Sequence, residues 1–121
     1  MATYTKVKLS GSTDGRAIKV VQTATAGTLI HTGSTTTTTY DEVWLYAQNT
    51  SASAVKLTIE WGGTSSPDDL IELTVQPEAG LVTVAPELLI KGNASAALVI
   101  RAFAATANVI TIHGFVNQIT A

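Results

Sequence analysis

The sequence predicts an all-β domain folded as an antiparallel β-sandwich, with a jelly-roll-like strand arrangement as the first choice. Apolar residues make up 45% of the 121 residues and are mostly Val, Ile, Leu and Ala, while Thr is abundant. β-branched side chains suit a pleated sheet better than a helix. Polar and apolar positions alternate in many short segments, and turn residues separate these segments at the spacing of sandwiches and barrels. An immunoglobulin-like sandwich is the alternative.

The first third of the chain is expected to hold three short strands. Residues 4–9 alternate polar and apolar positions, and residues 17–21 and 28–31 form two further strands. The Thr-rich run 33–39 is uncharged and predicts a flexible loop or an edge segment. Two interpretations of segment 1–16 stay open, namely an extended arm that reaches a neighbouring molecule or a frayed terminus.

The clearest alternation lies in residues 41–49 and 54–61, which we expect to form a hairpin around a short turn. Such alternation marks an antiparallel sheet with one solvated face. The side chains expected to face the core are Val43, Leu45, Ala47, Val55, Leu57, Ile59 and Trp61. In the second strand, those expected to face water are Lys56, Thr58 and Glu60.

The second half predicts further short strands. In residues 70–75, Ile71, Leu73 and Val75 are expected to face inward, with Glu72 and Thr74 outward. Residues 81–84 form a strand that Pro86 bends or ends. Residues 87–91 continue as a strand or form one helical turn, and the pattern does not decide between them. Two longer strands, 97–104 and 109–119, close a single domain that spans residues 1–121.

Four residues are candidates for an interface between molecules. Trp44 and Tyr46 lie on the face opposite Val43 and Leu45, so that strand is apolar on both sides. Aromatic residues are enriched at interface hot spots, although filling the core is an equal explanation. If they mark a contact between subunits, Trp44→Ala loosens the oligomer and leaves the monomer folded. Segment 97–104 is also apolar on both faces, which adds Leu98 and Ile100 to the candidate interface.

Charge and composition argue against several functions. The chain has 7 Lys and Arg residues, 9 Asp and Glu residues and a net charge of −2, so we expect no nucleic-acid partner. Cysteine is absent, which excludes disulfides and thiolate metal sites. No segment approaches the ~18 apolar residues of a membrane span, and the start lacks the apolar stretch of a signal peptide. We therefore expect synthesis in a cytoplasm and no membrane partner.

No group of residues predicts catalysis, a cofactor or a metal. The two histidines, His31 and His113, are expected to be ordinary strand residues. Glu60 and Glu72 occupy outward strand positions rather than forming the carboxylate pair of a glycosidase. The Asp68-Asp69 pair could help to hold calcium, but turn formation by an Asp side chain is the commoner role. The chain is therefore expected not to be an enzyme.

Four segments together resemble small structural proteins of tailed-bacteriophage virions, including the decoration or cement proteins of the head. They are Tyr40-Asp41-Glu42-Val43-Trp44-Leu45-Tyr46-Ala47-Gln48-Asn49, Leu57-Thr58-Ile59-Glu60-Trp61-Gly62-Gly63-Thr64, Pro67-Asp68-Asp69, and Val99-Ile100-Arg101-Ala102-Phe103-Ala104-Ala105-Thr106-Ala107-Asn108. This resemblance covers most of the chain and has no catalytic signature.

The resemblance implies a β-sandwich homotrimer on the outer surface of the virion head, where it binds the major capsid protein and stabilises the assembled shell. Binding only to the assembled shell stabilises that shell by mass action, and many copies on a lattice attach more firmly than one. The resemblance assigns no capsid-contact residues. A tail-associated or carbohydrate-binding β-sandwich module is the alternative, with Trp44, Tyr46 or Trp61 as aromatic residues for a sugar.

Overall fold

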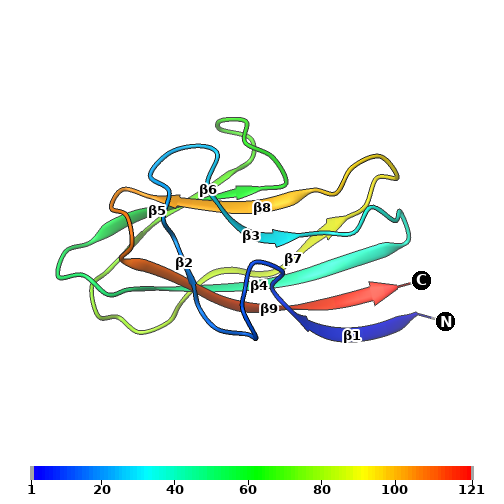
Figure 1. The fold of residues 1–121 in the computed structure, drawn as a ribbon, viewed down its shortest axis with the longest axis horizontal. Helices are drawn as coiled ribbons and strands as arrows, with labels where there is room; N and C mark the ends of the chain where they lie inside the picture. Colours follow the sequence, from blue (N-terminus) through cyan, green and yellow to red (C-terminus); the bar gives the residue numbers. More distant parts are fainter. Residues whose placement is uncertain (1, 121) are drawn as a thin grey trace.

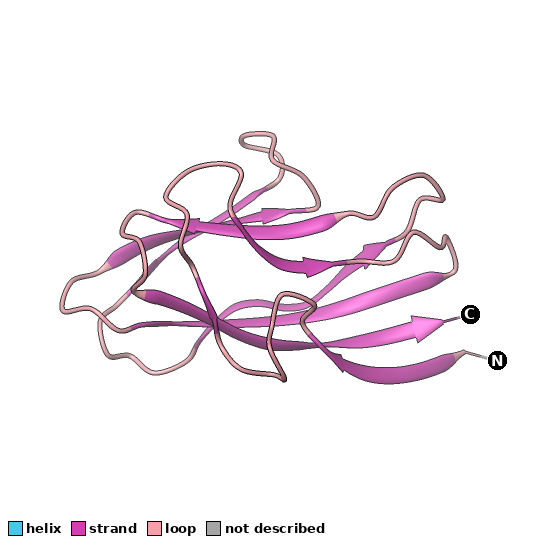
Figure 2. Ribbon diagram, in the orientation of Figure 1, coloured by secondary structure: helices cyan, strands magenta, loops and turns pink. Residues whose placement is uncertain are grey.

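The computed structural model describes residues 2–120, which form two antiparallel sheets packed face to face (Figure 1). Figure 2 shows strands joined by loops, and no helix occurs in the described part of the chain. Consequently, these residues include no helix that could cross a membrane. The strands are β1 (Thr3–Lys8), β2 (Ile18–Lys19), β3 (Thr28–Thr32), β4 (Thr39–Asn49), β5 (Val55–Trp61), β6 (Leu70–Val75), β7 (Val82–Lys91), β8 (Val99–Ala104) and β9 (Ile110–Thr120).

The strand order is that of a jelly roll. Sheet A has the order β1-β9-β4-β7, with β2 also paired to β9, and sheet B has the order β3-β8-β5-β6. If β1 and β2 are counted as one interrupted strand, this strand pairs with β9, β3 pairs with β8, β4 with β7, and β5 with β6. A long antiparallel ribbon rolled into two sheets gives this pattern. The predicted jelly roll is confirmed, because an immunoglobulin-like sandwich places its first and last strands in different sheets.

The predicted hairpin between residues 41–49 and 54–61 is wrong. β4 belongs to sheet A and β5 to sheet B, and β5 forms its hairpin with β6. The turn between β4 and β5 carries the chain from one layer to the other. The buried Asn49 side chain stabilises this crossing, because its amide donates to the carbonyls of Ser53 at 2.7 Å and Val75 at 2.9 Å. Alternation of side chains indicates which face is buried but does not indicate which strand lies alongside.

One core fills the space between the sheets, and the predicted inward residues lie in it. Val43, Leu45, Ala47, Leu57 and Ile59 are 0% exposed. Burial of these branched side chains is the main force that holds the two layers together. Other predicted inward residues also contact this core, and they are the buried Val55 and Val75 and the partly buried Trp61, Ile71 and Leu73.

Pro86 bends the seventh strand without ending it, and residues 87–91 continue as strand. The register of β7 against β4 shifts between Val43 and Leu45, which places a bulge at Pro86 and Glu87. Glu87 has a φ of 55°, in the left-handed region. A bulge leaves a residue unpaired, so a proline without an N–H is accommodated there.

Two polar side chains that were expected to face water are buried. Thr58 is 3% exposed and Glu60 is 0% exposed, so the prediction for both is wrong. They do point away from the core, but the β2–β3 loop lies over the outer face of sheet B, where its Thr25 hydroxyl and Gly27 N–H donate to the Glu60 carboxylate. Lys56 lies beyond the loop, is exposed as predicted, and forms a surface ion pair with Glu72 at 3.0 Å.

The N-terminal segment is part of sheet A. Residues 3–8 pair with β9 at six consecutive positions as an edge strand, and the chain then turns away before β2. The Thr-rich run forms an exposed loop over residues 34–38, and Thr39 begins β4.

Candidate functional site

The outer face of sheet A gathers most of the aromatic side chains of the chain. All three tyrosines, one of the two tryptophans and one of the two phenylalanines point outward there. Residues directly opposite each other in antiparallel strands share a face, so the pairs place these side chains together. The pairs on this face are Tyr4 and Tyr40 with Ile119, Glu42 with Asn117, Trp44 with Phe115, and Tyr46 with His113.

This aromatic face lies on the outside of the sandwich. The core lies on the other side of β4 and β9, and sheet B covers only that inner side (Figure 1). Tyr4 is 72% exposed and Leu89, which pairs with Glu42 from β7, is 55% exposed. An exposed apolar area of this kind is typical of a surface that binds another molecule.

Trp44 and Phe115 form the centre of the aromatic face. Their ring centroids lie 5.7 Å apart and their planes differ by 10°, so the rings stack on each other. Gly114 allows this close approach of β9 to β4, because a Cβ at that position would lie 2.0 Å from the Trp44 carbonyl oxygen. The pair therefore depends on a glycine at the neighbouring position.

The edges of this stack carry charged and polar groups. The Lys6 ammonium lies 4.7 Å from the centre of the Phe115 ring, a cation–π contact. Since β9 lies between β1 and β4, Lys6 and Trp44 approach Phe115 from opposite sides. The Glu42 carboxylate accepts hydrogen bonds from Asn117 at 2.9 Å and from the Trp44 indole at 3.0 Å. The Asn117 bond first, and the Trp44 bond second, lower the pKa of Glu42.

His113 extends the aromatic face beside Tyr46. Its Nδ1 atom is buried without a hydrogen-bond partner among residues 2–120, and so is the Thr111 hydroxyl two positions earlier on the same strand. Although these two atoms are buried, His113 and Thr111 as whole residues are only partly buried.

Of the four interface candidates, the structure brings two together. Trp44 and Tyr46 both point outward on β4 and are partly exposed. Ile100 is 0% exposed and belongs to the core, so it has no surface to offer a partner in this fold. Leu98 precedes β8, is partly buried and packs against the core. Neither lies on the face that holds Trp44.

His31 lies in β3, as expected of a strand residue, and its side chain forms a buried pair with Asp41 that the sequence did not predict. The His31 Nε2 and Asp41 Oδ2 atoms are 2.8 Å apart, and the residues are 4% and 1% exposed. The Ser10 backbone N–H donates to His31 Nδ1 at 3.1 Å, which requires the proton to sit on Nε2 and donate to Asp41. Gln118 also donates to Asp41 at 3.1 Å. Both imidazole nitrogens are occupied, so this pair joins the layers rather than acting on a substrate.

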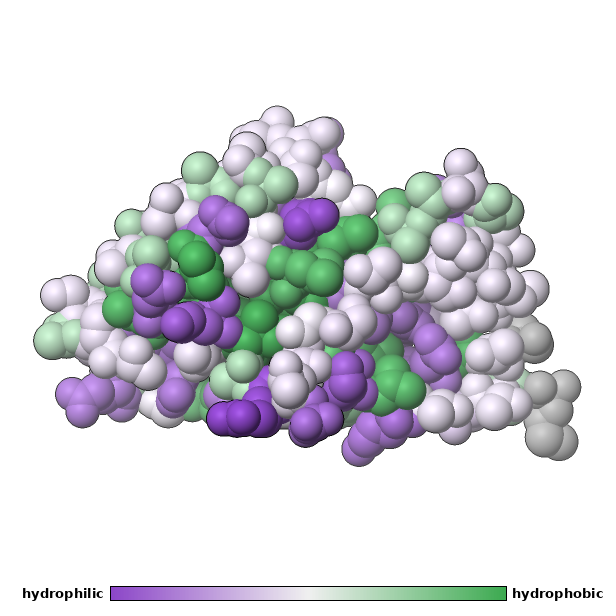
Figure 3. All heavy atoms as spheres, in the orientation of Figure 1, coloured by the Kyte–Doolittle hydropathy of each residue, from purple (hydrophilic) through white to green (hydrophobic). Residues whose placement is uncertain are grey.

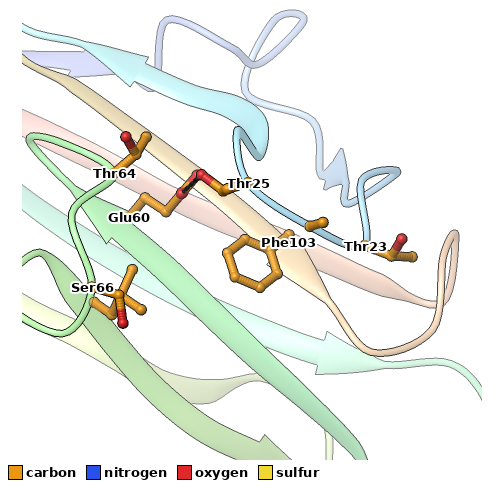
Figure 4. A pocket seen from close by; sticks show the side chains of 8 residues that line it. Thr23, Thr25, Glu60, Thr64, Ser66 and Phe103 are labelled. Atoms are coloured by element: carbon orange, nitrogen blue, oxygen red, sulfur yellow. Dashed lines mark hydrogen bonds between the residues drawn. The ribbon is translucent and has the colours of Figure 1, made fainter.

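The outer face of sheet B holds a small pocket of about 280 Å³ between the β2–β3 and β5–β6 loops. Figure 4 shows Phe103 in this pocket and Glu60 pointing toward Thr25. The Glu60 carboxylate accepts hydrogen bonds from the Thr25 hydroxyl and from the Gly27 N–H, the latter at 2.7 Å. Since Glu60 is 0% exposed, its carboxylate holds the loop in place and is not available at the pocket mouth.

The remaining acidic candidates do not form a site together. The Asp69 carboxylate accepts the Ser65 N–H at 3.1 Å, which confirms the predicted turn role for this residue. Among the described residues, no group of three or more His, Asp or Glu side chains is placed to hold a metal ion. Glu60 is buried under a loop, whereas Glu72 is exposed and paired with Lys56.

No protein-family model, curated protein or solved structure matches this chain. The face of sheet A therefore has to be interpreted from its own geometry. Alternation in residues 41–49 identified Trp44 and Tyr46. It missed Phe115, Tyr4 and Tyr40, because only the pairing of β1, β9 and β4 brings these residues together.

Proposed function

We propose that this chain is a non-catalytic structural protein of a tailed-bacteriophage virion that decorates the head. In this proposal it binds the assembled shell through the outer face of sheet A. The observation that carries the proposal is the aromatic face centred on Trp44 and Phe115, which no second layer covers within residues 2–120. The sequence resemblance to head decoration proteins supplies the biological setting.

The fold and the buried polar groups support this proposal. Jelly rolls are common among viral capsid domains, so the fold is one that shell proteins use. The buried His31–Asp41 pair and the buried Glu60 are both fully engaged in holding the fold. A rigid body that has a binding face, and whose buried His31, Asp41 and Glu60 are engaged in holding the fold, suits attachment better than chemistry.

A carbohydrate-binding or tail-associated module is the second candidate, because aromatic side chains on a sheet often bind sugars. A sugar ring stacks on the open face of an aromatic ring. The two faces of Phe115 are taken by Trp44 and by the Lys6 ammonium, which leaves its edge toward solvent. Only the outer side of Trp44 and the tyrosines remain for stacking, so the geometry favours a protein partner.

Electron microscopy of particles from the source of this chain tests the proposal. With a gold-labelled antibody against the chain, we expect label spread over the heads. Label confined to tail tips would overturn the decoration function and support the second candidate, as would clear hits on a glycan array. Particles without label would overturn both virion assignments.

The trimer implied by the resemblance is tested by sedimentation. Analytical ultracentrifugation of the purified chain at micromolar concentration is expected to give a single species of three times the chain mass. A monomer at all concentrations would remove the trimer from the proposal and leave only attachment of single molecules.

A further inference from the structure

The charged residues of this molecule are divided between its two sides. Of the 7 Lys and Arg residues, four point outward on sheet A. Each of them pairs with a residue of β9 or β4 whose side chain points outward, and paired residues share a face. These four are Lys6, Lys8, Lys19 and Lys91, and all are exposed. On the opposite side, β6 and the loop before it carry acidic side chains, which are Asp68, Asp69 and Glu72.

The four lysines surround the aromatic centre. Lys6 and Lys8 lie on the β1 edge, Lys19 is on β2 at one end of β9, and Lys91 is on β7 beside Tyr40. The acidic groups near them are Glu42, which is held by Asn117 and Trp44, and Glu87 at the β7 bulge. Hydrophilic residues line the lower margin of the molecule in Figure 3, next to sheet A, below a hydrophobic band between the sheets. An apolar centre with a charged border is the common design of protein interfaces.

The size of this face suits one side of a specific complex. Four strands spaced by about 4.8 Å, with about 3.4 Å per residue along β4, give a face of roughly 20 by 35 Å. Its area of roughly 700 Å² approaches the ~800 Å² that each partner contributes to an interface of standard size.

The charges and rings also select the occupant. A second copy that docked the same face about a two-fold axis would bring four lysines against four lysines, which disfavours that pairing. Single-stranded nucleic acid stacks successive bases on open aromatic faces. Phe115 is enclosed by Trp44 and the Lys6 ammonium, so bases would have only the outer side of Trp44 and the tyrosines to stack on. A protein surface with carboxylates around an apolar centre matches both features.

We propose that the outer face of sheet A docks on a carboxylate-rich protein surface, with its lysines pairing around the Trp44–Phe115 stack. This inference rests on the proposed function, in which that surface belongs to the shell. It differs from the expectation that Trp44 lies between copies of the chain, and the proposed trimer then uses other surfaces.

A titration of the ¹⁵N-labelled chain with poly-L-glutamate tests the charge preference directly. The two indole N–H signals serve as reporters, because Trp44 lies on the proposed face and Trp61 packs against the core. We expect the Trp44 signal and the β1 and β9 amides to shift at low salt, with Trp61 unchanged. Binding should weaken steeply between 0.05 and 0.5 M salt, since screening shortens the range of exposed charges.

Matched charge removals provide the control. Lys6→Gln with Lys8→Gln removes two charges from the face, and Lys56→Gln with Arg101→Gln removes two charges from sheet B. The first pair should weaken poly-L-glutamate binding by about tenfold and the second by less than about twofold. Equal effects of both pairs would overturn the proposal. So would tighter binding of a dT20 oligonucleotide than of poly-L-glutamate, or self-association of the chain that Trp44→Ala abolishes.

Attachment to purified shells separates this inference from the proposed function. Shell binding that persists unchanged at 0.5 M salt and in the Lys6→Gln, Lys8→Gln variant would leave the decoration function intact and overturn the acidic partner. Absence of shell binding together with selective poly-L-glutamate binding would overturn the decoration function and support the acidic partner.

Discussion

The outer faces of the two sheets each carry a glutamate on a central strand, but the two glutamates have different surroundings. Each central strand carries a glutamate that points away from the core, Glu42 on β4 and Glu60 on β5. Glu42 remains partly exposed beside Trp44. Glu60 is completely buried because the β2–β3 loop closes over it. This comparison shows that a polar side chain pointing away from the core is exposed to water only where no loop covers the sheet.

The largest effect should come from removing the buried glutamate. Glu60→Ala leaves the Gly27 N–H and the Thr25 hydroxyl without their acceptor, so we expect the free energy of unfolding to fall by about 2–4 kcal/mol. Glu42→Ala is the matched change on the other sheet and should cost less. Urea denaturation measures both. Equal losses would show that the loop over sheet B does not depend on Glu60.

The aromatic stack should contribute a smaller amount to stability. Trp44→Ala is expected to lower the free energy of unfolding by about 1–2 kcal/mol and to leave the fold intact, because the ring is only partly buried. A double-mutant cycle with Phe115→Leu should give a coupling of about 0.5–1.5 kcal/mol. A coupling near zero would mean that the stack is not maintained in solution.

The Lys6 contact should be weaker still. Lys6→Gln is expected to cost about 0.5 kcal/mol, and the cost should vanish in a Phe115→Leu background if it comes from the cation–π contact. Lys8→Gln is the control on the same strand. If Lys6→Gln lowers the free energy of unfolding equally with Phe115 and with Phe115→Leu, the loss comes from general charge effects and not from a cation–π contact.

The smallest effect concerns pH. Hydrogen bonds from Asn117 and then Trp44 favour the charged form of Glu42, so its pKa lies below the ordinary value of 4.5. The stability from these bonds is therefore present above pH 4.5 and is lost as pH falls from 4.5 through the lowered pKa. An NMR titration of the Glu42 carboxyl should give a midpoint below 4.5 that rises in Asn117→Ala. A midpoint at or above 4.5 in the unmodified chain would contradict this account.

Much of the local structure was predictable from alternation, whereas the pairing was not. The alternation predicted the bounds of the strand over residues 70–75 and the side chains around Val43 and Leu57 that face the core. It could not show that β4 and β5 separate into different sheets, since side-chain direction carries no information on neighbours. The wrong placement of Glu60 has the same origin, because a distant loop buries it.

Only part of the candidate site was predictable, for a related reason. Trp44 and Tyr46 follow from alternation within one strand. Phe115 and Lys6 join them only through the register of β9 and β1. The His31–Asp41 pair was missed because the register of β3 shifts between Leu29 and His31, which turns His31 inward against the simple alternation.

Co-sedimentation with virion heads stripped of this chain tests most directly which sheet binds. Two variants that each remove one partly buried ring are compared, Trp44→Ala on sheet A and Phe103→Ala on sheet B, after urea denaturation has shown that both are folded. The account predicts that Trp44→Ala weakens binding at least tenfold while Phe103→Ala binds as the unmodified chain does. Loss of binding with Phe103→Ala and retention with Trp44→Ala would contradict it.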